Sequence, residues 1–322
     1  MVDSRNNPST EPVLRAVATI LSRHVKHAGS LVVGYSGGLD STVLLDAVHH
    51  LAASNGYRVA ARHVHHGLSE HADSWADSCA RFCLKLGVLF DVARVKIPIS
   101  STEGQEAAAR RLRHAALSNH PADWILLAHH ADDQAETLLH NLLRGTGLRG
   151  AAAMPETNGR LLRPFLTLPR SDLWAYAQAR HLSWIEDESN ADQRYTRNFL
   201  RGRVLPIIAD RFPKSCHQLA AAARRFGEAE SLLEQLAMVD LGERSPHFPV
   251  PLQLFRDLPE DRARNLLRAL LGWQRVQSPD ERRLTEFVRQ LRTARSDRKP
   301  VVAVGAYTLR CESGLLHFEA GV

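Results

Sequence analysis

A glycine pair flanked by serines and an aspartate is the first feature of the sequence that could do chemistry. The segment reads Ser36-Gly37-Gly38-Leu39-Asp40-Ser41. Glycine carries no side chain, so backbone N–H groups can close on an anion here, and the two serine hydroxyls add donors. Asp40 supplies a carboxylate of the kind that holds Mg²⁺ beside phosphates. The segment therefore predicts a phosphate-binding loop in which Asp40 is the metal ligand.

This loop differs from two common nucleotide-binding motifs. No Gly-Lys-Ser/Thr follows the glycines, as in a Walker loop, and the spacing is not G-x-G-x-x-G. Without a lysine on the β- and γ-phosphates, pyrophosphate is held mainly by backbone, which suits attack on the α-phosphorus and formation of an adenylate. The simpler alternative is a tight turn, which Gly-Gly pairs commonly form. The strand-like residues before the loop and the helical spacing after it favour the phosphate site.

A second polar cluster follows a predicted strand at 123–128. It reads His129-His130-Ala131-Asp132-Asp133-Gln134-Ala135-Glu136. Asp133 and Glu136 are three residues apart, so they share one face of the helix that begins here. Asp132 alone would suffice as a helix cap. The further carboxylates predict a site that binds an amine.

Three other groups of residues are candidates for binding. His63 ends a predicted strand, and parallel sheets bind ligands at the carboxyl ends of their strands. Arg110 lies on an arginine-rich helix, and we expect it to touch phosphate. An acidic turn at 186–188 precedes the last group, which is Arg197, Asn198, Arg201 and Arg203. Each group also has a simpler interpretation. The histidines around His63 could be exposed or could bind a metal, the helix of Arg110 could present a solvated face, and the last group could form an internal salt-bridge network with the acidic turn.

Strand-like runs and helical spacings alternate through the first two hundred residues. Besides the strand before the loop, we expect strands at 57–64, 88–95 and 123–128 and helices at 12–26, 41–51, 73–86 and 106–117. This alternation predicts an α/β fold with a parallel sheet.

The later part of the chain has a different pattern of expected helices and strands. We expect a helix at 169–180 capped by Ser171 and Asp172, a long helix at 217–242 and a strand at 250–254. Helices followed by strands predict a small α+β domain. The expected division is a catalytic domain at 1–213 and a substrate domain at 214–322.

Composition narrows the class of protein. The 322 residues carry a formal net charge of +6, and four cysteines are too few for a disulfide framework. Arginines between 262 and 298 predict a nucleic-acid surface in the C-terminal part. No apolar run is long enough to span a membrane and the N-terminus lacks an apolar leader, so we expect a cytoplasmic protein without a membrane partner.

Several of these segments together resemble the family of tRNA(Ile)-lysidine synthases, which are PP-loop ATP pyrophosphatases. The resemblance rests on the loop at 36–41, the cluster at 129–137 and an Asp-x-Ser-Asn at 187–190 followed by Arg197-Asn198. It implies an adenine nucleotide alpha hydrolase-like, Rossmann-like catalytic domain. It also implies a ligase that adenylates carbon 2 of the wobble cytidine of the CAU-anticodon isoleucine tRNA with ATP. Free lysine then displaces AMP, which gives lysidine.

The resemblance also implies roles for individual residues. Asp40 would hold Mg²⁺, and the expected catalytic residues are Asp40, His129, Asp133 and Glu136. The expected ATP-binding residues are Ser36, Gly37, Gly38, Leu39, Asp40, Ser41, His63 and Arg110. Those expected to bind lysine or tRNA are Asp133, Glu136, Arg197, Asn198, Arg201 and Arg203.

Two features depart from the family and two other functions share part of the pattern. His114 stands where relatives carry tyrosine, and the chain is too short for a full extra C-terminal domain, so residues 217–322 would grip the tRNA. A PP-loop tRNA thiolase would need reactive cysteines, which Cys79 and Cys83 do not suggest by their spacing. A non-catalytic tRNA-binding protein would not need an intact loop. A homodimer is compatible with the sequence.

Overall fold

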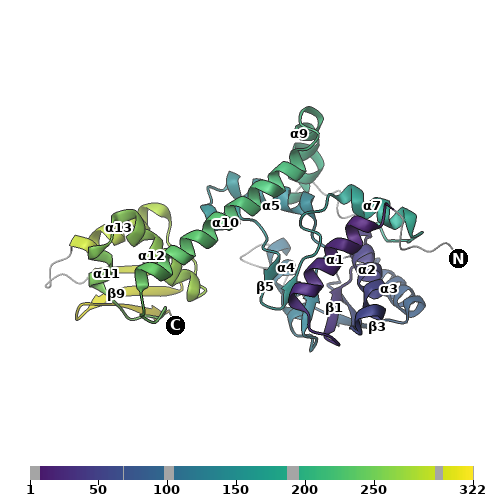
Figure 1. Cartoon of the computed structure of the whole chain (residues 1–322), viewed down its shortest axis with the longest axis horizontal. Helices are drawn as coiled ribbons and strands as arrows, with labels where there is room; N and C mark the ends of the chain where they lie inside the picture. The colour runs from purple at the N-terminus through teal and green to yellow at the C-terminus, as the bar shows by residue number, and fades with distance from the viewer. Residues whose placement is uncertain (1–7, 68, 98–104, 187–195, 294–299, 322) are drawn as a thin grey trace. The chain divides into compact units, whose positions relative to one another are not determined.

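The computed structural model describes residues 8–67, 69–97, 105–186, 196–293 and 300–321. The chain divides into two compact units, Met1–Gly227 and Glu228–Val322 (Figure 1). Helix α10 (Ser215–Leu241) contains the boundary between them, whereas the expected domain boundary at 213/214 lies just before this helix. In the described ranges no helix is both long and apolar enough to cross a membrane.

The first unit is built on a six-stranded sheet of order β3-β2-β1-β4-β6-β5. Its strands are β1 (Ser30–Gly34), β2 (Arg58–His65), β3 (Leu89–Arg94), β4 (Trp124–Leu126), β5 (Thr157–Asn158) and β6 (Leu161–Leu162). All neighbours are parallel except β5 and β6. The strand order reverses at β1 and β4, so the segments leaving these two strands meet at the carboxyl edge, where such sheets bind ligands. The predicted parallel α/β fold is confirmed.

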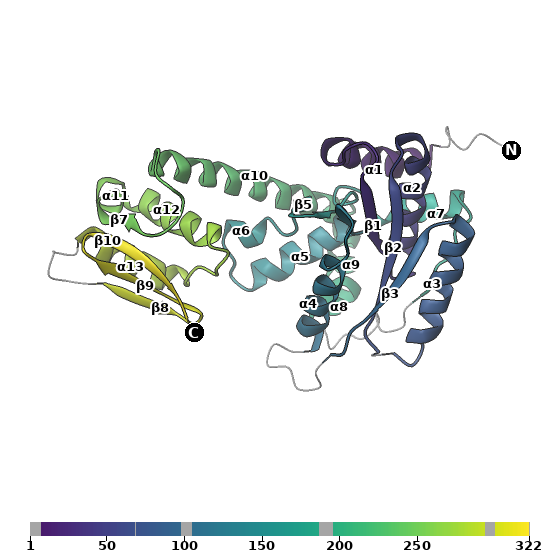
Figure 2. The ribbon, with the colours of Figure 1, turned by 90° about the horizontal axis from the view of Figure 1, so that it is seen from below.

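Alternate residues of β1 face two separate apolar cores, as the pleat of a strand requires. Leu31 and Val33 pack with α1 (Glu11–His24), α2 (Leu39–Asn55), α3 (Ala72–Leu86) and α7 (Arg170–Ala179). Val32 packs with Leu117 of α4 (Gln105–Ser118) in the other core. Helices α3 and α4 accordingly lie on opposite sides of the sheet in Figure 2. Helices on both faces fix the carboxyl edge of the sheet.

The remaining helices of this unit follow β4 and α7. They are α5 (Ala131–Leu143), α6 (Leu148–Ala151), α8 (Thr196–Phe199), a π-helical turn at Leu200–Val204 and α9 (Leu205–Arg211). Helix α5 packs through Leu138 against Ala223 of α10.

A buried carboxylate holds α7 against α2. Asp46 of α2 is 2% exposed, and its Oδ2 accepts a hydrogen bond of 2.7 Å from the Tyr176 hydroxyl of α7. Arg180 Nε donates to the same oxygen at 3.1 Å. Since Tyr176 and Leu173 are fully buried, these contacts fix α7 relative to α2.

The second unit contains a four-stranded sheet of order β7-β10-β9-β8, antiparallel throughout. Its elements are β7 (Val250–Pro251), α11 (Leu252–Asp257), α12 (Glu260–Trp273), α13 (Glu281–Thr293), β8 (Val301–Val304), β9 (Tyr307–Glu312) and β10 (Leu315–Ala320). Leu309 and Leu316 of the sheet share a core with Leu266 of α12 and Phe287 of α13. The predicted small domain of helices followed by strands is confirmed.

Two local predictions are wrong. Helix α7 begins at Arg170 with Pro169 as its N-cap residue, and neither Ser171 nor Asp172 caps it. The Asp132 carboxylate instead accepts the first N–H of this helix from a distant part of the sequence. The segment at 250–254 contains only two strand residues before α11 begins, because Pro251 has no N–H with which to extend the ladder.

Candidate active site

Gly37 shapes the loop between β1 and α2. Its φ of +87° is a backbone conformation that other residues rarely adopt. A Cβ at this position would lie 2.7 Å from Ile185 Cδ1 and 2.9 Å from Cys79 Sγ. The Gly37 carbonyl also accepts a hydrogen bond from the Ile185 N–H at 2.9 Å. Both conformation and packing therefore require glycine here.

Hydroxyl groups hold the rest of the loop in shape. Ser36 Oγ lies 3.0 Å from Ser41 Oγ, which also donates to the Gly38 carbonyl at 3.1 Å. Thr42 Oγ1 donates to the same carbonyl at 2.9 Å. The loop is thus ordered by its own side chains, as a preformed anion site requires.

Three helices begin next to this loop. Helix α2 starts directly after it, and the first carboxylate of α5, Asp132, accepts a hydrogen bond from the first N–H of α7, Arg170, at 2.8 Å. Asp40 of α2 lies 3.6 Å from both Arg170 Nε and His130 Nε2. Helix N-termini carry partial positive charge, so their convergence favours anions at this point.

His130 connects the phosphate loop to the acidic cluster. Its Nε2 lies 3.6 Å from Asp40 Oδ2 and 3.4 Å from Asp133 Oδ2, and its Nδ1 lies 3.2 Å from Asp132 Oδ2. Burial lowers the pKa of His130, but the carboxylates of Asp132, Asp40 and Asp133 outweigh burial and raise this pKa to about 10. The imidazole is therefore cationic at neutral pH and joins the two groups of carboxylates.

Asp133 and Glu136 form a pair of carboxylates that is bridged by arginine. Arg201 Nη2 lies 2.6 Å from Asp133 Oδ1, and Arg201 Nε donates to Glu136 Oε2 at 3.0 Å. Arg197 Nε lies 3.9 Å from Glu136 Oε1. Glu136 is 3% exposed, and burial raises its pKa although the Arg201 charge opposes the effect. The pair therefore accommodates a cationic group, and Arg201 supplies one.

His129 is a neutral base beside this pair. Burial lowers the pKa of His129; the Asp133 charge opposes this, and the charges of Arg163, Arg113 and Arg110 lower the pKa further. Its Nδ1 is buried without a hydrogen-bond partner in the structure. His129 is therefore uncharged at neutral pH and keeps one ring nitrogen without a partner.

His63 faces the backbone rather than the solvent. It is 6% exposed, and its Nδ1 donates to the Tyr35 carbonyl at 3.0 Å, directly before the loop. Burial lowers the pKa of His63. Its place at the end of β2 supports a role in shaping the nucleotide site.

The structure brings together most of the expected site residues. One edge of the sheet holds the loop residues together with His129, Asp133, Glu136 and Arg201. Arg110 is near enough for its charge to lower the pKa of His129. Asn198 lies on α8, and Arg203 lies on the π-helical turn. The expected acidic turn lies partly outside the described residues, which resume at Thr196.

Four residues near the site were not among those expected to act. They are His130, Asp132, Arg163 and Arg170. Arg163 is 5% exposed and donates through Nη1 to the Pro155 carbonyl at 2.8 Å. Arg163 directly follows β6 and Arg170 lies a few residues later, so the rule that ligands bind beyond carboxyl ends of strands could have identified both.

Asp40 is suited to a metal ion. Its Oδ1 is buried and has no hydrogen-bond partner in the structure, and Mg²⁺ is usually held by one or two carboxylates together with phosphate oxygens. Within the described ranges, no three or more His, Cys, Asp or Glu side chains are grouped as a metal site. Asp40 therefore fits an ion that also binds the phosphates.

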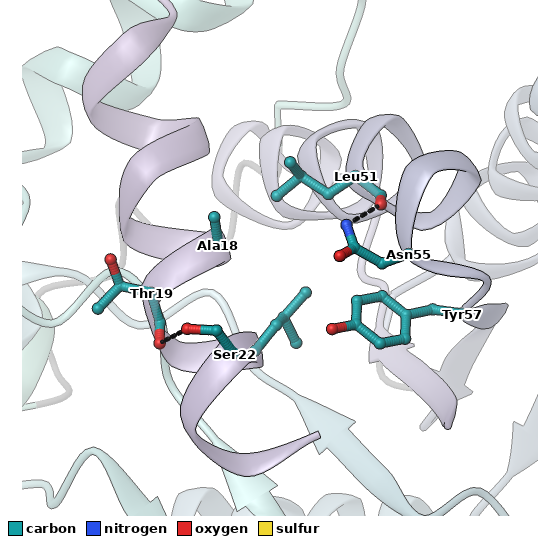
Figure 3. Close-up of a pocket in the computed structure, with 7 residues that line it drawn as sticks. Ala18, Thr19, Ser22, Leu51, Asn55 and Tyr57 are labelled. Atoms are coloured by element: carbon teal, nitrogen blue, oxygen red, sulfur yellow. Dashed lines mark hydrogen bonds between the residues drawn. The ribbon is translucent and has the colours of Figure 1, made fainter. Parts of the chain in front are cut away.

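A separate hollow lies at the opposite end of α2 (Figure 3). It measures about 310 Å³ and is lined by residues of α1, by Leu51 and Asn55 of α2 and by Tyr57. Asn55 is the last residue of α2, a helix of 17 residues that is about 25 Å long. The hollow is therefore far from the phosphate loop and is not part of the site.

The sheet order and the phosphate loop define a PP-loop nucleotide-binding protein. A family model described as "PP-loop domain" matches residues 10–208, and a second model, "TilS substrate binding domain", matches residues 251–317. A relative from Aromatoleum aromaticum is 48% identical over 81% of this chain and 62% of its own length. Relatives from Nitrosomonas europaea and Pseudomonas aeruginosa are 38% and 41% identical over 92% of this chain, and 67% and 69% of their own.

All three relatives are named tRNA(Ile)-lysidine synthase. The chain belongs to this family. It spans 62% to 65% of the length of the first three curated relatives that it matches.

A solved structure shares the fold. The U34-tRNA thiolase NcsA from Methanococcus maripaludis aligns with a TM-score of 0.57 over 68% of this chain and 79% of that chain, at 16% identity.

Proposed function

We propose that the protein forms lysidine on the CAU-anticodon isoleucine tRNA, using ATP and free lysine. The observation that carries the proposal is the position of His130. One imidazole nitrogen lies 3.6 Å from Asp40 Oδ2 in the phosphate loop and 3.4 Å from Asp133 Oδ2 in the carboxylate pair. A phosphate site and a cation site are thus adjacent, as a reaction needs when it first adenylates a base and then adds an amine to it.

In the first half-reaction, the loop holds the pyrophosphate end of ATP. Backbone N–H groups after Gly37 and the Ser36 and Ser41 hydroxyls face the phosphates. Asp40 would hold Mg²⁺, which neutralises phosphate charge when bound. The cytidine oxygen attacks the α-phosphorus, and pyrophosphate leaves. The cytidine must leave the anticodon stack to reach this point, and we assign RNA binding to Arg197, Asn198 and Arg203.

In the second half-reaction, Asp133 and Glu136 bind the ε-ammonium of lysine. Arg201 bridges these carboxylates in the structure, which supports a cation site between them. An amine must lose a proton before it attacks carbon 2 of the base. Glu136 suits the role of general base because burial raises its pKa, and neutral His129 is a second acceptor. AMP then leaves.

Cys79 and Cys83 argue against sulfur transfer. Burial raises the pKa of Cys79 to about 12 and that of Cys83 to about 11. Both thiols are fully buried and would remain protonated, whereas a thiolate is the reactive form. The fold shared with a thiolase therefore does not favour thiolase chemistry in this chain.

The test is lysine incorporation by the purified chain. The protein is incubated with ATP, Mg²⁺, radiolabelled lysine and the CAU-anticodon isoleucine transcript, and label in precipitated RNA is counted together with AMP. We expect lysine in the RNA with an equal amount of AMP, and none in a transcript with uridine in place of the wobble cytidine. Absence of label from the cytidine transcript, with folded protein and intact RNA, would contradict the proposal.

A further inference from the structure

The phosphate loop contains no cation of its own. Residues 36–41 include neither lysine nor arginine, and the hydroxyls that order the loop, those of Ser36, Ser41 and the following Thr42, carry no charge. Pyrophosphate is a highly charged leaving group, and a forked guanidinium is well suited to bind it. A cation from another element would therefore complete the site.

Arg170 and the His130 imidazole lie at the same distance from the loop's carboxylate, and of the two only Arg170 carries a forked guanidinium. Arg170 Nε lies 3.6 Å from Asp40 Oδ1, an atom with no hydrogen-bond partner, and the Arg170 side chain is 60% exposed. An ion pair as exposed as this contributes little to stability. The guanidinium is thus able to move toward a phosphate at small cost.

The backbone that carries Arg170 is fixed. Helices α2 and α7 contact each other at Asp40 and Arg170, and again at Asp46 and Tyr176, six residues further along each helix. The two helices therefore run side by side in the same direction for about 9 Å, with their N-termini together. The Asp132 carboxylate holds the Arg170 N–H at 2.8 Å. Only the guanidinium end of Arg170 is left mobile.

We infer that Arg170 binds the β- and γ-phosphates of ATP and takes the place of the lysine that the loop lacks. Without nucleotide it pairs with Asp40, and with nucleotide it turns to the phosphates. In adenylation, which rests on the proposed function, the cytidine oxygen forms a bond to the α-phosphorus. The bond from that phosphorus to the bridging oxygen breaks, and its electron pair leaves on pyrophosphate. Two N–H donors of Arg170 neutralise the charge that accumulates there.

The binding test uses Arg170→Gln and Arg170→Lys in the full chain. Arg15→Gln is the matched control, because Arg15 is also an exposed arginine with one carboxylate partner, Glu11 at 3.7 Å. Calorimetry measures the affinity for magnesium pyrophosphate and for an ATP analogue with a methylene bridge between the α- and β-phosphates. We expect Arg170→Gln to weaken both about tenfold or more, Arg170→Lys to lie between, and the control to be unchanged.

Affinities of Arg170→Gln within twofold of the wild type would overturn the inference. If this variant does not fold, Arg170→Met, which also removes the charge, is read in its place: weaker binding supports the inference and wild-type affinity overturns it. The outcome is independent of lysidine formation. If the wild type makes no lysidine but Arg170→Gln binds pyrophosphate weakly, the proposed function fails and the inference stands. If lysidine forms and Arg170→Gln binds pyrophosphate with wild-type affinity, the proposed function stands and the inference fails.

Discussion

Arginines in the two units pair with different kinds of carboxylate. In the first unit, Arg201 pairs with Asp133 and Glu136 of the candidate site. In the second unit, Arg262 of α12 pairs with Asp240 of α10, whose side chain is buried, but other arginines of α12 and α13 pair with exposed acids on the same two helices or next to them. These pairs are Arg268–Glu281, Arg283–Asp280, Arg289–Glu286 and Arg292–Glu260.

Charge counts agree with this difference. Residues 228–322 contain 14 arginine and lysine residues and 14 aspartate and glutamate residues, so their formal net charge is zero. The whole excess of +6 lies in residues 1–227. The prediction of a basic C-terminal part rested on its arginines alone and left out the acidic residues among them. A run of arginines is therefore evidence for a nucleic-acid surface only when its acids are counted with it.

The largest effect is expected from substitution of Asp40, the carboxylate that lies beside both Arg170 and His130. Asp40→Asn keeps the shape of the side chain but removes the charge that would hold the metal ion. We expect pyrophosphate release with tRNA to fall about 100-fold or more, because a bound metal ion supplies several kcal/mol of charge stabilisation. Single-turnover assays with labelled ATP measure this rate. Affinity for tRNA should stay within about twofold; an unchanged rate would remove Asp40 from the metal site.

The buried hydrogen bonds of Asp46 with Tyr176 and Arg180 should stabilise the first unit. Asp46→Ala leaves the Tyr176 hydroxyl and Arg180 without their shared acceptor. We expect the free energy of unfolding to fall by about 2–3 kcal/mol at pH 7, measured by urea titration. Arg289→Gln in the second unit is the comparison, since both members of its pair are about half exposed, and its unfolding midpoint should not change measurably. Equal effects would refute the distinction between the two kinds of pair.

Glu136→Gln tests the carboxylate pair itself. The substitution removes one of two charges that would hold the lysine ammonium while Asp133 remains. We expect the KM for lysine to rise about tenfold or more, with the rate of pyrophosphate release on tRNA changed less. Titration with labelled lysine gives the KM, and ATP labelled at the γ-phosphate gives the rate of pyrophosphate release. A normal KM for lysine would show that the amine binds elsewhere.

The smallest effect is expected on tRNA affinity. Arg144 and Arg149 are exposed in the first unit, and exchanging both for Gln should weaken tRNA binding several-fold and lower the slope of log K against log salt by roughly 1.5. Arg283 and Arg289 exchanged for Gln form the matched pair in the second unit, and we expect their affinity to stay within about twofold. Filter binding at several salt concentrations measures the tRNA affinity and the salt slope of both double variants. A larger loss of affinity in the variant of the second unit would indicate that the RNA surface lies there.

Much of the fold was predictable because its signals are local. Apolar runs marked the strands of the parallel sheet, and Gly37 marked a turn that needs positive φ. The cluster at 129–136 was recognisable because four polar residues exceed what a helix cap needs. The start of α7 was mispredicted because its N–H partner, Asp132, lies 38 residues away.

The rest depended on contacts between distant segments. Nothing local to Arg170 shows that it meets Asp40, because only the packing of α7 on α2 brings them together. The pairing of Arg262 with Asp240 likewise joins α12 to α10. The π-helical turn that carries Arg201 has no sequence signature of its own. The sequence therefore identified Asp133, Glu136 and Arg201 as site residues, but it did not identify Arg170 or the contact that Arg170 makes with Asp40.

One experiment tests the central claim that the loop and the carboxylate pair serve successive steps. Wild type, Asp40→Asn and Glu136→Gln are incubated with the cytidine transcript, ATP labelled at the α-phosphate and labelled lysine at a concentration near the wild-type KM. We predict AMP and lysine transfer in the wild type and neither with Asp40→Asn. Glu136→Gln should retain adenylated RNA but incorporate little lysine. Lysine incorporation at the wild-type rate by Glu136→Gln, or adenylation by Asp40→Asn, would contradict the account.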